Sequence, residues 1–134
     1  MDSPADSPPP AIVLFGHGSR DPRWKEPFEA TRAEVQRQMP AASVRLAFLE
    51  HTPPDLDAAV AALAAEGHRV VEVVPLFLGA GAHVRTDIPA QAAAAAERHA
   101  IAVRVQPFVG ESPAVIAAIA RHVQSTLAAA GKGG

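Results

Sequence analysis

The segment VVEVVPLFL, residues 70–78, decides the fold class, because only Glu72 in it is ionisable and its apolar residues fall on both faces of an extended chain. A strand that is apolar on both faces is typical of a parallel sheet buried between helices. Pro75 lacks the N–H group that a sheet ladder needs. We therefore place Pro75 at the end of this strand, where the chain leaves the sheet.

Three similar apolar runs lie on either side of this segment, and helical stripes separate them. Together with residues 70–78, strands are expected at residues 11–15, 44–49 and 101–105. Apolar residues at helical spacing predict helices from Trp24 to Met39, from Leu56 to Leu63, through the alanine run up to His99, and from Ser112 to Leu127. Thr52 is expected to cap the second of these helices and Asp87 the third.

The strand–helix unit thus occurs four times, and this order predicts an α/β fold. We expect a single flavodoxin-like or chelatase-like domain over residues 11–130, with a four-stranded parallel sheet, helices on both faces and strand order 2-1-3-4. Residues 1–10 are proline-rich and are expected to form a disordered tail. Residues 131–134 are expected to fray at the C-terminus.

Composition excludes several classes of function. The chain has 134 residues, which suits one domain, and it has no cysteine, so disulfides and thiolate metal sites are excluded. Its net charge of −2 gives no sign of nucleic-acid binding. No apolar run reaches the roughly 20 residues of a membrane span, and the acidic, proline-rich start differs from a signal peptide. We therefore expect a cytoplasmic protein without a membrane or nucleic-acid partner.

The six histidines divide between the two edges of the predicted sheet. Ligands of open parallel sheets bind beyond the carboxyl ends of the strands. His17, His51 and His83 each follow a strand and therefore share this edge. The remaining histidines are expected at the surface, as helix caps or at an interface: His68, His99 and His122.

Two loops at this edge repeat one pattern, a histidine near glycines followed by arginine and aspartate. They are GHGSRDPR, residues 16–23, and GAGAHVRTDIP, residues 79–89. Glu50 ends the strand that neighbours the first loop, so its carboxylate and the His17 imidazole could converge on one ion. Two imidazoles and a carboxylate suit cobalt, iron, nickel or zinc. His17, His83 and Glu50 are the candidate metal ligands.

Three blocks resemble the CbiX/SirB-type class II chelatases, the sirohydrochlorin chelatases. The blocks are LFGHGSRDPRW, LAFLE followed by PPDLDAAV, and VVPLFLGAGAHVRTDIP, and the likeness runs from about Ile12 to Gly110. The resemblance implies insertion of Co²⁺ or Fe²⁺ into sirohydrochlorin, toward cobalamin or siroheme, while close relatives use Ni²⁺. The metal is then a substrate, and no organic cofactor is implied. The family's two metal-site histidines match His17 and His83, and its acidic residue matches Glu50.

The resemblance also implies an anionic tetrapyrrole substrate and a homodimer, because this chain has the length of the short, one-domain members. Arg20, Arg23 and Arg85 are expected to bind substrate carboxylates, and Gly18 and Gly81 to let the flat macrocycle approach. His51 has no role assigned by the resemblance. Two alternatives stay open: a metal carrier without chelatase activity, and a module that binds a phosphorylated small molecule at residues 16–20.

Overall fold

The computed structural model describes residues 8–133, and side chains as far as Gly131. Four strands alternate with helices, as the sequence predicts. The elements are β1 (Ala11–Gly16), η2 (Pro22–Lys25), α1 (Glu26–Gln38), β2 (Ser43–Phe48), α2 (Leu56–Ala65), β3 (Val70–Pro75), α3 (Ala82–His99), β4 (Ala102–Val105), η3 (Val109–Glu111) and α4 (Pro113–Gly133). Most of the expected N-terminal tail, and residue 134, lie outside the described residues.

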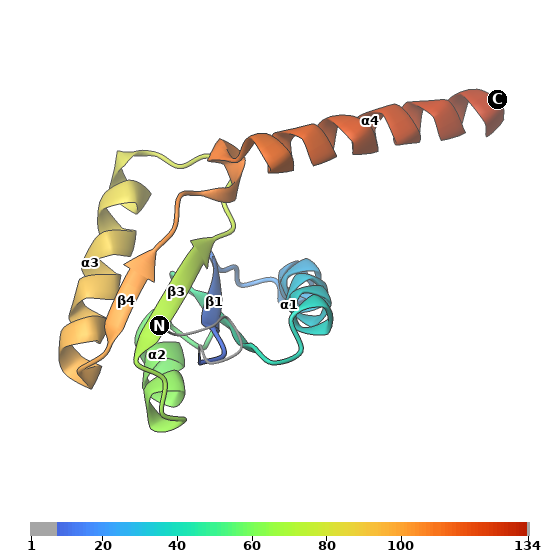
Figure 1. Ribbon diagram of the computed structural model, residues 1–134. Coiled ribbons are helices and arrows are strands. Elements are labelled where there is room, and N and C mark those ends of the chain that lie inside the picture. The colour runs from blue at the N-terminus through green and yellow to red at the C-terminus, as the bar shows by residue number, and fades with distance from the viewer. Residues whose placement is uncertain (1–7, 134) are drawn as a thin grey trace.

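The strands form one parallel sheet in the order β2-β1-β3-β4, which confirms the predicted order (Figure 1). Pro75 is the last residue of β3, where its missing N–H breaks no further ladder bond, so this prediction is also correct. All four carboxyl ends therefore meet at one edge, at the top of Figure 1. We call this the site edge.

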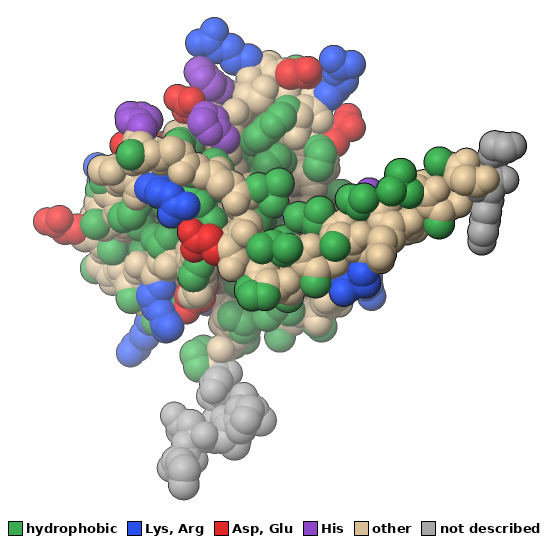
Figure 2. Space-filling model, turned by 90° about the horizontal axis from the view of Figure 1, so that it is seen from above, with side chains coloured by type: hydrophobic (Ala, Val, Ile, Leu, Met, Phe, Trp, Pro, Cys, Tyr) green, Lys and Arg blue, Asp and Glu red, His purple; other side chains and the backbone are tan. Residues whose placement is uncertain are grey.

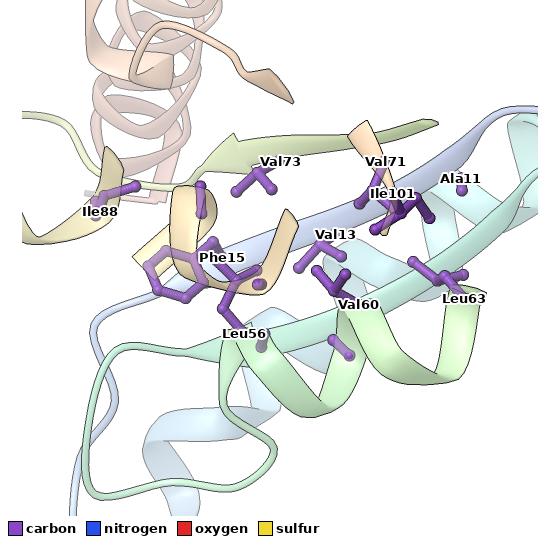
Figure 3. Close-up of a cluster of buried hydrophobic side chains, with 14 of the residues drawn as sticks. Ala11, Val13, Phe15, Leu56, Val60, Leu63, Val71, Val73, Ile88 and Ile101 are labelled. Atoms are coloured by element: carbon purple, nitrogen blue, oxygen red, sulfur yellow. The ribbon is translucent and has the colours of Figure 1, made fainter. Parts of the chain in front are cut away.

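Helices cover both faces of the sheet, and each face has its own apolar cluster. Apolar side chains of α2 and α3 pack on one face, against Val13, Phe15 and Val73 (Figure 3). On the other face, Trp24, Phe28 and Val35 from η2 and α1 pack against β1 and β2. No polar or charged residue is buried in the described part of the chain, so the apolar clusters alone fill the interior.

Two helix starts differ from the sequence predictions. The N-cap of α2 is Asp55, whose carboxylate accepts a hydrogen bond from the Ala58 N–H at 2.9 Å, and Thr52 instead bonds to the loop after β1. The third helix begins at Ala82, after an N-cap at Gly81, and not at Asp87. The Thr86 hydroxyl donates to the Ala82 carbonyl at 2.9 Å within this unexpected first turn. His83 consequently lies on a helix and not in a loop.

The last helix differs from the others because it stands away from the domain (Figure 1). It continues to Gly133, beyond the domain end expected at residue 130. Among the described elements, η3 is the only one that α4 packs against to any extent.

Candidate active site at the carboxyl ends of the strands

Hydrogen bonds join the loops that follow β1 and β2, so the residues at the ends of these strands keep fixed positions. The Glu50 N–H donates to the His17 carbonyl at 3.0 Å, which extends the ladder past the last paired strand residues. The Thr52 hydroxyl accepts from the Ser19 N–H at 3.0 Å and donates to the Ser19 carbonyl at 2.8 Å. Gly18 has a φ of +100°, and a Cβ there would lie 1.7 Å from the Glu50 carbonyl oxygen. Only glycine therefore lets the two loops approach this closely.

His17 and Glu50, both predicted metal ligands, form a direct pair. The His17 Nε2 atom lies 2.9 Å from Glu50 Oε1, and the side chains are 45% and 51% exposed. This hydrogen bond is the largest cause of a lowered pKa at Glu50, with smaller contributions from the charges of His51, His17 and His83. The carboxylate is thus held ionised next to an imidazole. The pair can receive a cation or pass on a proton.

His51 is the second imidazole beside this carboxylate, with its Nε2 atom 3.6 Å from Glu50 Oε1. Its Nδ1 accepts a hydrogen bond from the Arg20 Nε at 3.4 Å, which favours the tautomer with hydrogen on Nε2. The backbone of His51 has a φ of +64°, a conformation unfavourable for a residue with a side chain. Strained residues of this kind often occur at functional sites, and no pattern in the amino-acid sequence predicts the strain.

His83 reaches the same edge from the first turn of α3. Its side chain is 87% exposed, and its Nε2 atom lies 2.9 Å from Asp87 Oδ2, one helical turn further along. Gly81 has an ordinary φ of −75°, and nothing lies within 4 Å of an added Cβ there. The glycine before His83 is therefore not needed for backbone geometry, in contrast to Gly18.

The three candidate arginines are at the site edge, but their surroundings differ. Arg23 contacts Asp21, with its Nη2 3.3 Å from the carboxylate. Arg85 Nη1 lies 3.2 Å from Glu111 Oε1, and its guanidinium stacks 4.8 Å from the centre of the Phe108 ring. Arg20 has no carboxylate partner among residues 8–133. Its guanidinium has the most hydrogen-bonding capacity left for an anionic ligand.

The candidate ligands do not form a closed metal site. Within the described part of the chain, no three His, Asp or Glu side chains are close enough together to hold an ion. His17 and His51 approach Glu50, whereas His83 contacts Asp87. Figure 2 looks down on this edge and shows histidine, acidic and basic side chains gathered beside one another. These exposed side chains could therefore bind an ion and still leave some of its coordination positions open.

His68 and His99, which were expected at the surface or as helix caps, are partly buried and hydrogen-bonded. His68 Nε2 lies 3.1 Å from Ser43 Oγ, and His99 Nε2 lies 3.1 Å from Asp57 Oδ1. Sequence reasoning missed Thr52, Asp87 and Glu111 as partners at the site edge. The i, i+4 spacing of His83 and Asp87 would have identified that pair once the helix start was known.

Over residues 8–133, no helix is both long enough and apolar enough to span a membrane.

Comparison with known proteins identifies the family of this chain. The chain matches the model of the CbiX family over residues 11–126. Sirohydrochlorin cobaltochelatases are among its curated relatives: the one of Methanosarcina acetivorans is 35% identical over 58% of this chain and 60% of its own length. That of Methanothermobacter thermautotrophicus is 36% identical over 66% of this chain and 62% of its own length. The matches thus span less than two thirds of these relatives.

Two solved structures are similar in fold and sequence. A CbiX protein from Marinobacter aquaeolei VT8, named for cobalamin (vitamin B12) biosynthesis, superimposes with a TM-score of 0.81 at 34% identity, over 89% of this chain and 98% of that one. The sirohydrochlorin chelatase SirB from Bacillus subtilis subspecies spizizenii, solved in complex with cobalt, gives a TM-score of 0.74 at 27% identity. This match covers 87% of this chain and 50% of SirB.

Proposed function

The chain belongs to the CbiX family, and we propose that it is a sirohydrochlorin chelatase, a lyase that inserts cobalt or iron into its tetrapyrrole substrate. The observation that carries this proposal is the His17–Glu50 pair, exposed at the site edge with a lowered pKa at the carboxyl group. The names of the relatives and the cobalt complex of SirB support the same reaction class.

The proposed reaction exchanges one divalent cation for two pyrrole protons. His17, His83 and Glu50 receive the ion, which must shed water before it enters the macrocycle. As the ion enters, the two pyrrole N–H bonds break and their protons leave to basic groups at the same edge. Neutral imidazoles accept protons near neutral pH, and the ionised Glu50 lies 2.9 Å from one of them.

The arginines would bind the carboxylates of the substrate. Arg20 is the best candidate to bind a substrate carboxylate, because it pairs with no carboxylate among the described residues. Arg23 and Arg85 already pair with Asp21 and Glu111, so a substrate carboxylate would have to share or replace these partners. Gly81 leaves the site edge free of a side chain beside His83, since nothing lies within 4 Å of a Cβ added there, whereas the missing Cβ of Gly18 lets the loops of His17 and Glu50 approach each other. A flat macrocycle can approach such a surface closely.

We further propose a cytoplasmic homodimer. A small-molecule site usually encloses most of its ligand. One site edge with exposed histidines encloses little, whereas two copies facing each other would form a cleft. SirB is about twice as long as the part that this chain matches, which is consistent with two copies doing the work of one longer chain.

An insertion assay tests the function. The purified protein is mixed with sirohydrochlorin and Co²⁺, Fe²⁺ or Ni²⁺, and the absorption spectrum is followed against a reaction without protein. A chelatase accelerates the spectral change with at least one ion. A metal carrier binds the ion in equilibrium dialysis and leaves the spectrum at the uncatalysed rate, which would overturn the proposal.

A further inference from the structure

The first turn of α3, which carries His83, is weakly held by its own helix. Its N-cap, Gly81, forms no side-chain hydrogen bond, and no acidic residue lies in the first turn to complement the helix dipole. Pro89 has no N–H group, so the carbonyl of Arg85 lacks the helix hydrogen bond that it would otherwise accept. Apart from Val84, the first turn is exposed to solvent. Contacts from outside the helix are therefore needed to hold this turn in place.

Arg85 supplies such contacts, because its guanidinium joins the start of α3 to the segment after β4. Its Nε donates to the Ala80 carbonyl at 3.1 Å, and its Nη1 donates to Glu111 Oε1 at 3.2 Å. The same guanidinium lies 4.8 Å from the centre of the Phe108 ring, and Phe108 is buried. Three contacts of different kinds thus converge on one side chain of the turn that carries His83.

The surface on which Arg85 rests continues to the other candidate histidine. The Phe108 ring packs against Phe77 with the ring centres 5.5 Å apart, and Phe77 meets the His17 ring edge-on at 6.2 Å. The Gly110 N–H donates to the Phe77 carbonyl at 3.0 Å, which joins the segments after β3 and β4. Arg85 therefore fastens the first turn of α3 to the same group of side chains that contacts His17.

The charge of Arg85 is also balanced within the protein. A positive charge near the N-terminus of a helix is unfavourable for the helix dipole, and the Glu111 carboxylate offsets it. A substrate carboxylate that bound this guanidinium in a bidentate manner would compete with Glu111. Its binding would loosen the turn that carries His83. Arg20, in contrast, pairs with no carboxylate in the described chain and is free of this conflict.

We infer that Arg85 is a positioning residue, which holds the first turn of α3 so that His83 stays at the site edge with the other metal ligands. Glu111 acts only through Arg85. The inference rests on the proposed function, because it assigns Arg85 to the placement of a metal ligand and leaves the substrate carboxylates to Arg20 and Arg23.

Hydrogen exchange of the whole chain tests the positioning role without any substrate. Glu111→Gln removes the charge that Arg85 contacts and changes the shape of the side chain little. The Arg85 amide, which bonds to the Gly81 carbonyl at 3.1 Å, should then exchange about fivefold faster, as expected for the loss of one exposed ion pair. Arg98→Gln is the matched control at the other end of α3, because Arg98 pairs with Asp57 at 3.1 Å. It should leave this exchange unchanged.

Titration with Co²⁺ alone measures whether the turn places His83. Glu111→Gln and Arg85→Lys should each bind the ion several-fold more weakly than the wild type. Lysine keeps the charge but lacks the planar fork that reaches a carbonyl and a carboxylate at once, so it should not rescue binding. Arg98→Gln should bind as the wild type does, and circular dichroism checks that each variant is folded. Unchanged exchange, or unchanged cobalt affinity, in Glu111→Gln would overturn the inference.

Insertion kinetics separate positioning from substrate binding, because the two roles predict opposite effects of Glu111→Gln. If Arg85 positions His83, Glu111→Gln and Arg85→Gln both lower kcat several-fold and leave the KM for sirohydrochlorin within about twofold. If Arg85 binds a substrate carboxylate, Glu111→Gln frees the guanidinium and lowers this KM, whereas Arg85→Gln raises it. That result would overturn the inference.

The experiments also separate this inference from the proposed function. A wild-type protein that inserts no metal into sirohydrochlorin overturns the proposed function alone. Hydrogen exchange and cobalt binding then still decide the role of Arg85, since neither uses the tetrapyrrole. An active wild type whose first turn of α3 exchanges at the same rate in Glu111→Gln overturns the positioning role and leaves the chelatase proposal standing.

Discussion

The two edges of the sheet both carry a histidine paired with a carboxylate, yet they differ in exposure and in surroundings. At the site edge, His17 and Glu50 are 45% and 51% exposed, and no arginine contacts this carboxylate among the described residues. At the opposite edge, His68 is 16% exposed, and its partner Glu66 also binds Arg45 at 2.6 Å. A histidine–carboxylate pair by itself therefore does not identify a functional site, and the exposure of His17 and Glu50 is part of the argument. The distinguishing features are free ligand positions and a loop built around glycine.

The largest expected effect tests this difference directly. His17→Ala and His83→Ala should each lower the insertion rate by about 100-fold or more, because each removes an imidazole that receives the ion or a pyrrole proton. The matched substitutions His68→Ala and His99→Ala should leave the rate within about twofold while lowering stability, since both side chains are partly buried and hydrogen-bonded. Insertion assays at subsaturating metal, with thermal melting as a fold control, give the answer. If His17→Ala and His83→Ala both kept a near-normal insertion rate, the site edge would not differ from the opposite edge in its importance for insertion.

The second prediction concerns the glycines of the two site loops. Gly18→Ala should lower the free energy of unfolding by about 2–3 kcal/mol and lower the insertion rate, because its φ is +100° and the new Cβ would meet the Glu50 carbonyl oxygen. Gly79→Ala is the control, since nothing lies within 4 Å of an added Cβ there. Denaturant titration and the insertion assay measure the two effects. If Gly18→Ala and Gly79→Ala were equally stable, the loops that follow β1 and β2 would not need the close approach that Gly18 allows.

The sequence predicted the sheet better than it predicted the site. Strands that are apolar on both faces, with Pro75 at the end of one of them, were enough for the fold class and for the edge that carries His17, His51 and His83. The strand order was taken from flavodoxin-like folds, because the sequence alone does not determine it, and the structure confirms it. Helix starts were harder, because Thr52 and Asp87 are good capping residues that instead bond to Ser19 and His83. The left-handed backbone of His51 and the stacking of Arg85 on a ring depend on tertiary contacts, which spacing does not encode.

The third prediction compares the two non-glycine residues with positive φ in the described chain, one at each edge. Ala100, at +51°, ends α3, where the left-handed conformation is common and usually taken by glycine. His51, at +64°, lies at no helix end. Ala100→Gly and His51→Gly should each raise the free energy of unfolding by about 0.5–1 kcal/mol, since glycine relieves the steric conflict.

Activity distinguishes the two glycine variants. Ala100→Gly should keep the wild-type insertion rate, whereas His51→Gly should lose activity while it gains stability, because its imidazole lies 3.6 Å from the Glu50 carboxylate. If His51→Gly is more stable and fully active, then His51 is only a loop residue. A loss of stability in Ala100→Gly would instead contradict the strain argument itself.

The smallest expected effect concerns two of the carboxyl groups with a lowered pKa, Glu50 at the site edge and Glu66 at the opposite edge. A hydrogen bond from His17 is the largest cause at Glu50, and one from Arg45 is the largest cause at Glu66. A carboxyl group with a lowered pKa in the folded state contributes stability that is fully present above its ordinary value of 4.5, and loses it as the pH falls through the folded value. Both groups are at the surface, so added salt should weaken either contribution.

Glu66→Gln and Glu50→Gln should therefore each melt slightly below the wild type at pH 7, and the difference should close as the pH is lowered below 4.5. Thermal melts at several pH values, in low and high salt, measure this difference. Only Glu50→Gln should also lower the insertion rate, because the neutral amide beside His17 can neither attract a cation nor accept a pyrrole proton. A difference in melting that stays constant down to pH 3 would mean that packing, not charge, stabilises these residues. Equal insertion rates in the two variants would mean that the carboxylate at the site edge, like the one at the opposite edge, serves the fold alone.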